Sequence, residues 1–189
     1  MPFPTLTTPR LQLRELKARD ADALFAIHSD PETMRWFGAD PLVDRHQALQ
    51  LIEMFAEWRK APAPGTRWGI VRQSDGELLG SCGLFKWNRS WRNCVLGYEL
   101  GRPYWGEGWM SEALRAVLDY GFDNMNLHRV QAEIHPDNLA SIRLVERLGF
   151  RLEGRHRQQG HWGGQFHDLD CYGLLAHEWF GQRREPHAD

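Results

Sequence analysis

The stretch RPYWGEGWMSEAL, residues 102–114, places two glycines, Gly106 and Gly108, directly before a segment with helical periodicity. After Gly108 the core-facing positions recur at the spacing of one helix face, at Met110, Ala113, Leu114, Val117 and Gly121. A helix that begins at or just after Gly108 directs its free N–H groups and the positive end of its dipole back over the loop. Glycine lets an anion approach this backbone without an intervening Cβ. The stretch therefore predicts a diphosphate site made of backbone amides.

The two glycines alone do not define a known nucleotide-binding motif. Ser111 occupies the position at which a dinucleotide fingerprint has its third glycine, and no Gly-Lys-Ser/Thr follows as in a P-loop. A tight turn before a helix is the alternative interpretation of this spacing. Glu107 is compatible with a nearby phosphate only if its side chain turns outward.

A second informative stretch is HPDNLASIRLVERLGF, residues 135–150. Asn138 is the predicted N-cap of a helix, with Ser141 at the third helical position. Gly149 is the predicted left-handed residue after the last turn, where Phe150 packs back on Val145. Ser141 falls on the core-facing side of this helix, together with Leu144, Val145 and Leu148. Its hydroxyl therefore needs a partner, and a plain cap with a satisfied hydroxyl is the alternative to a functional role.

The remaining sequence predicts an alternation of strands and helices. Strands are predicted at residues 8–16, 66–72, 77–87, 93–100 and 128–135, and a final hairpin at 150–179. Helices are predicted after the N-caps Asp20 and Asp44, after Gly108 and at 138–148, with a short helical piece within 29–37. The second helix must end before Pro62 and Pro64. This order predicts an α/β (α+β) fold with one mixed, mostly antiparallel sheet and helices on both faces.

Length and composition fit a single globular domain. The chain has 189 residues, 42% of them hydrophobic and 25% charged, and we expect one domain over 1–181 with a polar, disordered tail at 182–189. The net charge of −2 argues against a protein that coats nucleic acid. The first twenty residues contain no unbroken apolar stretch of the kind that a signal peptide needs, and no apolar run approaches the length that spans a membrane. Cys82, Cys94 and Cys171 are expected to be buried thiols in a cytoplasmic protein.

The two stretches together resemble the GNAT superfamily of N-acetyltransferases, in particular the RimJ/RimL-type protein N-acetyltransferases. The resemblance rests on GYELGRPYWGEGWMSEAL, residues 97–114, followed about thirty residues later by residues 135–150. The segments at 7–37 and 161–175 are similar to the same branch, so the likeness covers nearly the whole chain. It implies a sheet splayed between two parallel strands, with acetyl-CoA bound in the splay and no metal.

The resemblance also implies roles for individual residues. The acetyl and pantetheine portion would run along backbone groups of Tyr98 and Leu100. The diphosphate would meet amides of the loop formed by Tyr104, Trp105, Gly106, Glu107, Gly108, Trp109 and Met110. Asn138 matches a residue that contacts pantetheine, and Ser141 matches a hydroxyl near the thioester sulfur. Pro103 stands where the family usually has Gln or Arg, a change that is common in the RimJ/RimL-type branch.

Acetyl transfer needs a neutral amine, a polarised carbonyl and a proton for the departing thiolate. Ser141 is the predicted proton donor, and Glu99, acting through a water, is the predicted base. Gly160 stands where some RimL-type enzymes carry a proposed catalytic Glu. Deprotonation would then rest on Glu99, on His161 or His135, or on water alone.

A site poor in bases favours an α-amine as acceptor. With a pKa near 7.7–8.0, roughly a tenth of α-amines are neutral at pH 7, against about one Lys amine in 2,500. The predicted acceptor is therefore a protein N-terminus, and Trp36 and Phe37 are expected to line its cleft. A small amine (a polyamine, an aminoglycoside or an amino-acid antimetabolite) and a non-catalytic acyl-CoA-binding module are the alternatives. We expect a monomer or homodimer with no direct nucleic-acid or membrane partner.

Three other features have simpler interpretations. The spacing of His156, His161 and His167 does not favour a metal site. Trp87 and Trp91 predict a cross-strand aromatic pair beside a three-residue turn, with an acceptor-binding lip as the alternative. Arg143 and Arg147 are either solvated charges or contacts to coenzyme A phosphates.

Overall fold

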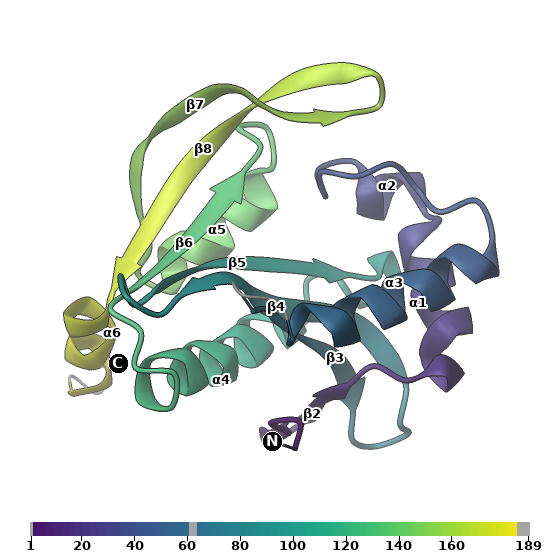
Figure 1. Ribbon diagram of the computed structural model, residues 1–189, viewed down its shortest axis with the longest axis horizontal. Helices are drawn as coiled ribbons and strands as arrows, with labels where there is room; N and C mark the ends of the chain where they lie inside the picture. Colours follow the sequence, from purple (N-terminus) through teal and green to yellow (C-terminus); the bar gives the residue numbers. More distant parts are fainter. Residues whose placement is uncertain (1, 61–63, 185–189) are drawn as a thin grey trace.

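The computed structural model describes residues 2–60 and 64–184. A single eight-stranded sheet runs through it in the order β1-β2-β3-β4-β5-β6-β8-β7 (Figure 1). Its strands are β1 (Leu6–Thr7), β2 (Leu11–Glu15), β3 (Thr66–Arg72), β4 (Leu78–Asn88), β5 (Asn93–Leu100), β6 (Arg129–Ile134), β7 (Arg151–Trp162) and β8 (Gln165–Leu175). All neighbouring pairs are antiparallel except β5 and β6, which are parallel. The predicted mixed, mostly antiparallel sheet is confirmed.

Helices cover both faces of the sheet. They are α1 (Ala21–His28), α2 (Pro31–Met34), α3 (Arg45–Trp58), α4 (Trp109–Asp123), α5 (Leu139–Arg147) and α6 (Ala176–Arg184), with short 3-10 turns η1 (Ala18–Asp20) and η2 (Arg102–Tyr104). The larger core packs α4, α5 and α6 against one face, with Trp68, Leu114, Val117 and Leu148 fully buried. The smaller core packs α1 and α3 against the other face. Burial of the helices' apolar faces on two sides therefore fixes the sheet between them.

The sheet is splayed between its two parallel strands. Strand β5 pairs with β6 only from Asn93 opposite Arg129 to Leu96 opposite Ala132. Beyond Ala132, β6 continues to pair with β8 as far as Ile134. The second half of β5 thus has no strand on this edge in the part of the chain that the structure describes. The opening lies where the carboxyl ends of two parallel strands diverge.

Most helix ends lie where the local sequence predicts them. Asp44 caps α3 by accepting a hydrogen bond from the Gln47 N–H at 2.9 Å, and Asn138 Oδ1 accepts the Ser141 N–H at 3.2 Å. After α5, Gly149 has φ +90°. Phe150 N–H donates to the Val145 carbonyl at 3.0 Å, as the predicted left-handed helix ending requires. Helix α3 ends at Trp58, before Pro64, whereas Pro62 lies outside the described residues.

Asp20 differs from the prediction. It directly precedes α1, but its carboxylate does not cap that helix. It pairs instead with the Arg14 guanidinium at 2.7 and 2.8 Å and accepts the Lys17 N–H at 2.8 Å. The side chain therefore joins β2 to the start of α1.

The predicted pairing of Trp87 with Trp91 is wrong. Asn88 pairs with Asn93, so the turn is longer than the three residues expected, and Trp91 lies in it with 74% of its surface exposed. The ring of Trp87 is covered instead by the Arg89 guanidinium at 4.5 Å. Neither tryptophan lies among the cleft residues described below, so the alternative role as an acceptor lip is not supported.

Two elements were missed at the ends of the chain. Strand β1 adds a short edge, and β8 ends at Leu175 rather than near Trp179 because α6 begins at Ala176. Trp179 lies in this helix, and its indole N–H donates to Asp119 at 3.0 Å. Residues 182–184 belong to α6, whereas 185–189 lie outside the described residues. Among the helices that the structure describes, none combines the length and apolarity needed to span a bilayer.

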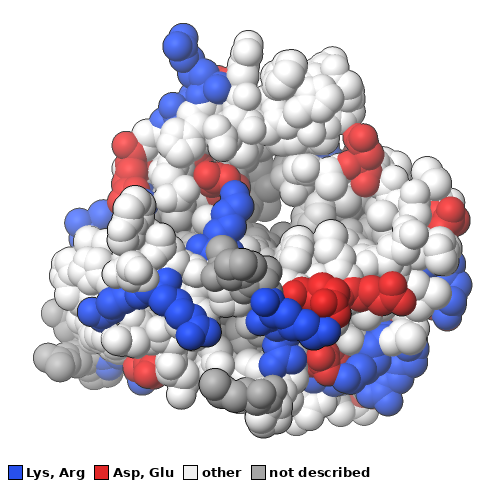
Figure 2. Space-filling view, viewed as in Figure 1, with Lys and Arg blue, Asp and Glu red and all other residues white. Residues whose placement is uncertain are grey.

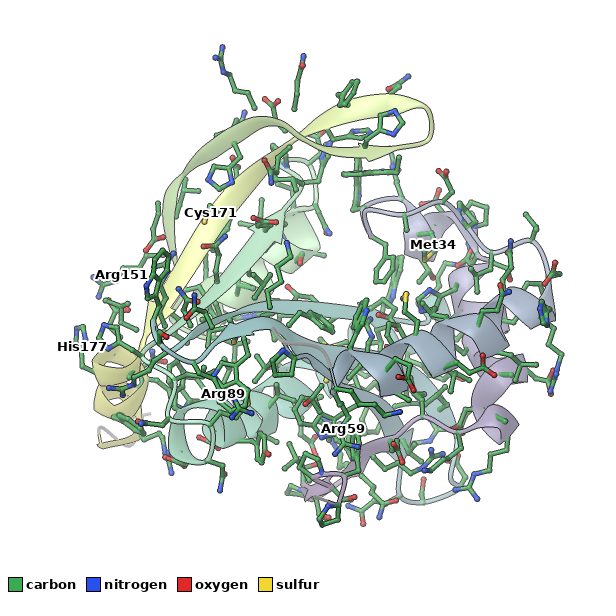
Figure 3. All side chains as sticks on the ribbon, in the orientation of Figure 1. Met34, Arg59, Arg89, Arg151, Cys171 and His177 are labelled. Carbon is green, nitrogen blue, oxygen red and sulfur yellow. The ribbon has the colours of Figure 1, made fainter. Side chains whose placement is uncertain are left out.

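The three cysteines are buried free thiols, as predicted. Burial raises the pKa of Cys82 to about 12 and also raises the pKa of Cys94 and of Cys171. Cys171 lies on β8, well away from Met34 on α2 (Figure 3). Raised pKa values keep these thiols protonated and unreactive at neutral pH.

Candidate active site

A cleft of about 1130 Å³ occupies the splay between β5 and β6. Figure 2 shows the molecule hollowed between the hairpin β7–β8 at the top and the body of the sheet below. The walls come from the end of β5, the loop before α4, the first turns of α5, and α2 with the residues that follow it. The predicted site residues that line it are Trp36, Phe37, Tyr98, Glu99, Leu100, Tyr104, Trp105, Gly106, Gly108, Trp109, Met110, Asn138 and Ser141. Only Glu107 of the predicted set does not.

Backbone groups of Tyr98 and Leu100 face the open edge of β5. On the other edge, Gly101 N–H donates to the Leu79 carbonyl at 2.8 Å, so Gly101 and every second residue before it bond to β4. The intervening Tyr98 and Leu100 therefore direct their N–H and C=O groups toward the splay. The Leu100 carbonyl accepts the Trp105 indole N–H at 2.7 Å. Within residues 2–60 and 64–184, the pairing of β5 with β6 ends at Leu96, so the Tyr98 N–H, the Tyr98 carbonyl and the Leu100 N–H remain for a ligand that carries amide groups.

The loop before α4 has the backbone that the two glycines predict. Gly106 and Gly108 have φ of +80° and +79°, and α4 begins at Trp109. The first helical hydrogen bond runs from Glu112 N–H to the Gly108 carbonyl, so the N–H groups before it are free of helical partners. A Cβ at Gly106 would meet no described atom within 4 Å. The backbone there is open to a close anionic ligand.

Contacts of Glu107 and Arg10 limit the free negative charge at this loop. The Glu107 carboxylate accepts the Trp109 indole N–H at 3.0 Å and does not line the cleft. Arg10, which the sequence reasoning did not single out, lies 4.0 Å from the Trp109 ring centre and pairs with Glu112 at 2.6 Å. Arg10 thereby ties the start of α4 to the chain just before β2. Arg10 lies 102 residues before Glu112 in the sequence, so no local pattern predicts this contact.

Tyr98 and Ser141 meet across the splay. The Tyr98 hydroxyl lies 2.5 Å from Ser141 Oγ, and the bond joins β5 to the first turn of α5. Burial raises the pKa of Tyr98 to about 12. The predicted need of Ser141 for a partner is confirmed, and that partner is another predicted site residue.

Glu99 is held in a buried cluster on the opposite face of β5. Arg67 Nη2 and the Ser81 hydroxyl both donate to its carboxylate, and His28 Nε2 lies 3.0 Å from Glu99 Oε1. Arg67 Nε also donates to Ser81 Oγ at 2.7 Å. The Glu99 side chain has 2% of its surface exposed and the Arg67 side chain 4%. Both oxygens of Glu99 thus already have partners within the protein.

The Arg67 guanidinium is enclosed by aromatic rings. Its carbon lies 4.9 Å from the ring centre of Phe55, 5.5 Å from that of Phe85 and 5.6 Å from that of Phe37. Burial lowers the pKa of Arg67 to about 10, which leaves it charged at neutral pH. The stability of the fold around this buried cation depends on its carboxylate partner, Glu99, because an unpaired buried charge is strongly destabilising.

His28 gives the fold a dependence on pH. Burial, with a smaller effect of Arg67, lowers the pKa of His28 to about 3, against about 6.5 in the unfolded chain. Below pH 6.5 the imidazole of His28 binds a proton in the unfolded state but not in the folded state. The free energy of unfolding is therefore highest above pH 6.5 and falls as the pH is lowered toward 3. We expect urea unfolding to show a loss of up to about 1.4 kcal/mol per pH unit in this window from His28 alone.

The variant His28→Gln removes this ionisation and keeps a side-chain N–H for Glu99. Its unfolding free energy should fall less steeply between pH 6.5 and 4.5 than that of the parent protein. His46→Gln, on the exposed side of α3, is the matched control and should keep the parent's slope. An equal slope for His28→Gln and the parent would contradict the assignment.

The tip of the hairpin β7–β8 is fastened to the segment after α2. The Trp162 indole N–H donates to the Arg35 carbonyl at 3.2 Å, and Gly163 N–H donates to Asp40 at 2.7 Å. A Cβ at Gly160 would lie 2.3 Å from the Trp162 ring. The absence of a side chain at Gly160 therefore leaves room for the Trp162 ring, whose N–H can then bond to the Arg35 carbonyl just after α2. This packing is a physical reason for glycine at position 160.

Trp36 forms the wall of the cleft beside this contact. His135, at the end of β6, stacks on Trp36 with ring centres 4.1 Å apart, and the Arg35 guanidinium lies 4.7 Å from the Trp36 ring centre. Desolvation lowers the pKa of His135, which favours its neutral form. His135 and His161 do not line the cleft in the described structure. Arg143 and Arg147 do line it, from α5.

Metal binding finds no support in the side-chain arrangement. Over residues 2–60 and 64–184, no three His, Cys, Asp or Glu side chains are grouped as ligands. Among the histidines considered above, His167 Nε2 lies 3.1 Å from the Trp162 carbonyl, and its ring stacks on Trp162. His161 likewise packs against Phe166, whereas His156 lies 3.9 Å from Glu133.

Comparison with known proteins identifies the family. Residues 10–151 match the model described as the acetyltransferase (GNAT) domain. The chain is 35% identical to the uncharacterized N-acetyltransferase p20 of Bacillus licheniformis, over 94% of this chain and 99% of that one. It is 36% identical to the uncharacterized N-acetyltransferase YoaA of Bacillus subtilis, over 92% and 97%. The chain belongs to the GNAT acetyltransferase family and is an acetyl-CoA-dependent N-acetyltransferase.

Other similar proteins carry more specific names. The [ribosomal protein uS5]-alanine N-acetyltransferase of Escherichia coli is 28% identical over 95% of this chain and 94% of its own length. Among solved structures, the spermidine N-acetyltransferase of Vibrio cholerae, in complex with CoA and spermine, has a TM-score of 0.79 at 20% identity and covers 92% of this chain and 99% of its own. At that identity the likeness shows the fold alone. The resemblance to the RimJ/RimL-type branch is confirmed, and the acceptor is not determined by these names.

Proposed function

We propose that this acetyltransferase modifies the α-amine at the N-terminus of a protein. The observation that carries the proposal is the charge balance of the cleft. Among the described residues, the four carboxylates that line the cleft (Glu32, Glu99, Glu133 and Asp137) are equalled in number by four guanidinium groups (Arg35, Arg67, Arg143 and Arg147). Glu99 is paired with Arg67, and Glu32 lies 3.9 Å from Arg35. A polycationic acceptor would need uncompensated carboxylates, whereas a single amine in its neutral form does not. The 28% identical relative named for an N-terminal alanine supports this choice.

The proposed reaction is direct attack in a ternary complex. The neutral amine nitrogen bonds to the thioester carbonyl carbon, and the carbon–sulfur bond breaks. One free N–H group at the open edge of β5, from Tyr98 or Leu100, stabilises the oxyanion that develops, and the other remains for an amide of the pantetheine. Asn138 holds Ser141 at the start of α5, and the Ser141 hydroxyl donates a hydrogen bond to the departing sulfur.

Glu99 as a base acting through a water stays a prediction. A proton delivered to Glu99 would displace one of the bonds from Arg67, Ser81 or His28. That arrangement favours a positioning role for Glu99, and solvent water can accept the proton from an α-ammonium, which needs little help near neutral pH.

The diphosphate of acetyl-CoA is assigned to the loop from Tyr104 to Met110 in the same proposal. The open backbone at Gly106, the free N–H groups at the start of α4 and the outward turn of Glu107 support it. Arg143 and Arg147 line the cleft on the adjoining wall and carry positive charge for the phosphates.

Rates on two matched peptides test the choice of acceptor. One peptide has a free N-terminus and no lysine, and the other has a blocked N-terminus and one lysine. At pH 7, release of the coenzyme A thiol should be at least about 100-fold faster with the first, since about 250 times more of its amine is neutral. With the first peptide, the rate should rise about tenfold per pH unit below pH 7 and level off above pH 8. Equal rates on the two peptides would refute the proposal.

A panel of spermine, an aminoglycoside and free amino acids separates the alternatives. Thiol release with one of these and not with peptides would assign the small-molecule function. Calorimetric binding of acetyl-CoA without thiol release on any amine would mean that the acceptor chemistry proposed here is wrong.

A further inference from the structure

The hydrogen bond between Tyr98 and Ser141 has a direction that follows from the acidity of its two groups. A phenol is a stronger acid than an alkyl alcohol and is therefore the better donor, whereas the serine oxygen is the better acceptor. Burial holds the pKa of Tyr98 near 12, so the phenol keeps its proton throughout the neutral range. Tyr98 Oη–H thus donates, and Ser141 Oγ accepts, over their separation of 2.5 Å.

The direction of this bond determines what remains free on Ser141. A hydroxyl carries one donor and two acceptor positions, and the bond from Tyr98 uses an acceptor position. The Ser141 proton is then free for another partner, and Ser141 lines the cleft where α5 meets β5 through Tyr98. Asn138 fixes the backbone of Ser141, and Tyr98 fixes the rotation of its hydroxyl.

We propose that Tyr98 is a positioning residue for acetyl transfer, which orients the Ser141 hydroxyl so that its proton points at the thioester sulfur. The inference rests on the proposed function, which places the sulfur beside Ser141. The two hydroxyls form a chain from phenol to serine to sulfur. Such a chain polarises each donor in turn and strengthens the bond to the developing thiolate.

The chain stabilises the leaving group without giving up a proton. When the carbon–sulfur bond breaks, its electron pair goes to sulfur, and the new carbon–nitrogen bond uses the lone pair of the amine. An ordinary thiol has a pKa near 8.5, well below that of either hydroxyl, so transfer of a proton from Tyr98 or Ser141 to the thiolate is uphill. The thiolate is reprotonated by the proton that the amine releases, through solvent.

A double-mutant cycle tests the inference, with Tyr98→Phe, Ser141→Ala and the double variant. Tyr98→Phe keeps the ring in the cleft and removes only the donor. We expect kcat to fall about tenfold with each single variant, while the Kd for acetyl-CoA from calorimetry changes less than twofold. In the Ser141→Ala background, Tyr98→Phe should have no further effect on kcat. Tyr120→Phe, whose half-buried ring packs on Trp68 outside the cleft, is the matched control and should leave kcat unchanged.

The outcomes distinguish this inference from the function on which it rests. Wild-type kcat in Ser141→Ala would overturn the proposed role of Ser141 and the inference with it. A slow Ser141→Ala beside a fully active Tyr98→Phe would overturn the inference alone, as would two losses that multiply in the double variant. If Tyr98→Phe does not fold, 3-fluorotyrosine at position 98 supplies a stronger donor of similar size. Its kcat should equal or exceed that of the parent protein, and a fall would overturn the inference.

Discussion

Glu99→Ala is expected to destabilise the protein by about 3–5 kcal/mol, because it leaves Arg67 charged and without a carboxylate in the buried cluster. The pKa of Arg67, lowered to about 10, still keeps the guanidinium protonated at pH 7. Urea unfolding at pH 7.5 measures the loss. Glu57→Ala, which breaks an exposed pair with Lys60, is the control and should cost no more than about 1 kcal/mol.

The paired replacement Arg67→Met with Glu99→Leu separates charge from packing. It removes both ions together, and the double variant should recover at least half of the stability that Glu99→Ala loses. A double variant as unstable as Glu99→Ala would show that the buried charge is not the cause. Glu99→Gln addresses the other role: a base at this position requires the ionisation of Glu99 to appear in the pH dependence of kcat/KM and to vanish in the variant.

Gly106→Asp is expected to weaken acetyl-CoA binding about 30-fold. Asp and Asn are the residues with a Cβ that most readily adopt positive φ, so the φ of +80° is tolerated. The new carboxylate would then lie beside the diphosphate, where like charges about 4 Å apart repel by about 1–4 kcal/mol. Gly108 is the poorer choice because its Cβ would lie 3.7 Å from Arg10, which would neutralise the new charge.

Calorimetry with two comparison variants checks this result. Gly106→Asn has the shape of the aspartate without its charge and should lose no more than about fivefold in affinity. Gly164→Asp places the same residue at φ +71°, at the hairpin tip outside the cleft, and should bind as the parent protein does. Unchanged affinity in Gly106→Asp would remove the diphosphate from this loop.

Features set by neighbouring residues could be predicted from the sequence. Positive φ at Gly106 and Gly108, the Asn138 cap and the left-handed ending at Gly149 each depend on a few consecutive residues. Successive residues of a strand point to opposite faces, and the structure shows Glu99 on the face opposite Tyr98, as this alternation predicts. The splay itself followed from the family resemblance, since no periodicity says where two parallel strands part.

Features built from distant segments could not be predicted. The partners of Glu99 lie 18, 32 and 71 positions away, at Ser81, Arg67 and His28, and no local pattern links them. The turn after Asn88 is longer than expected, which moved Trp91 out of register with Trp87. Helix α6 was missed because it contains Gly181 and has little amphipathic character. Its first residues, as far as Trp179, were assigned to the hairpin, and its last residues to the polar tail.

In the described part of the chain, the second half of β5 has one unpaired edge, which makes the stability of the fold depend on the binding of acetyl-CoA. The hydrogen-bond ladder between β5 and β6 ends at Ala132, and a ligand whose amides bond to Tyr98 and Leu100 would continue it. Acetyl-CoA present at 100 times its dissociation constant would add about 2.7 kcal/mol to the free energy of unfolding. Saturation with acetyl-CoA would thereby lower the population of the unfolded state, in addition to supplying the acetyl group.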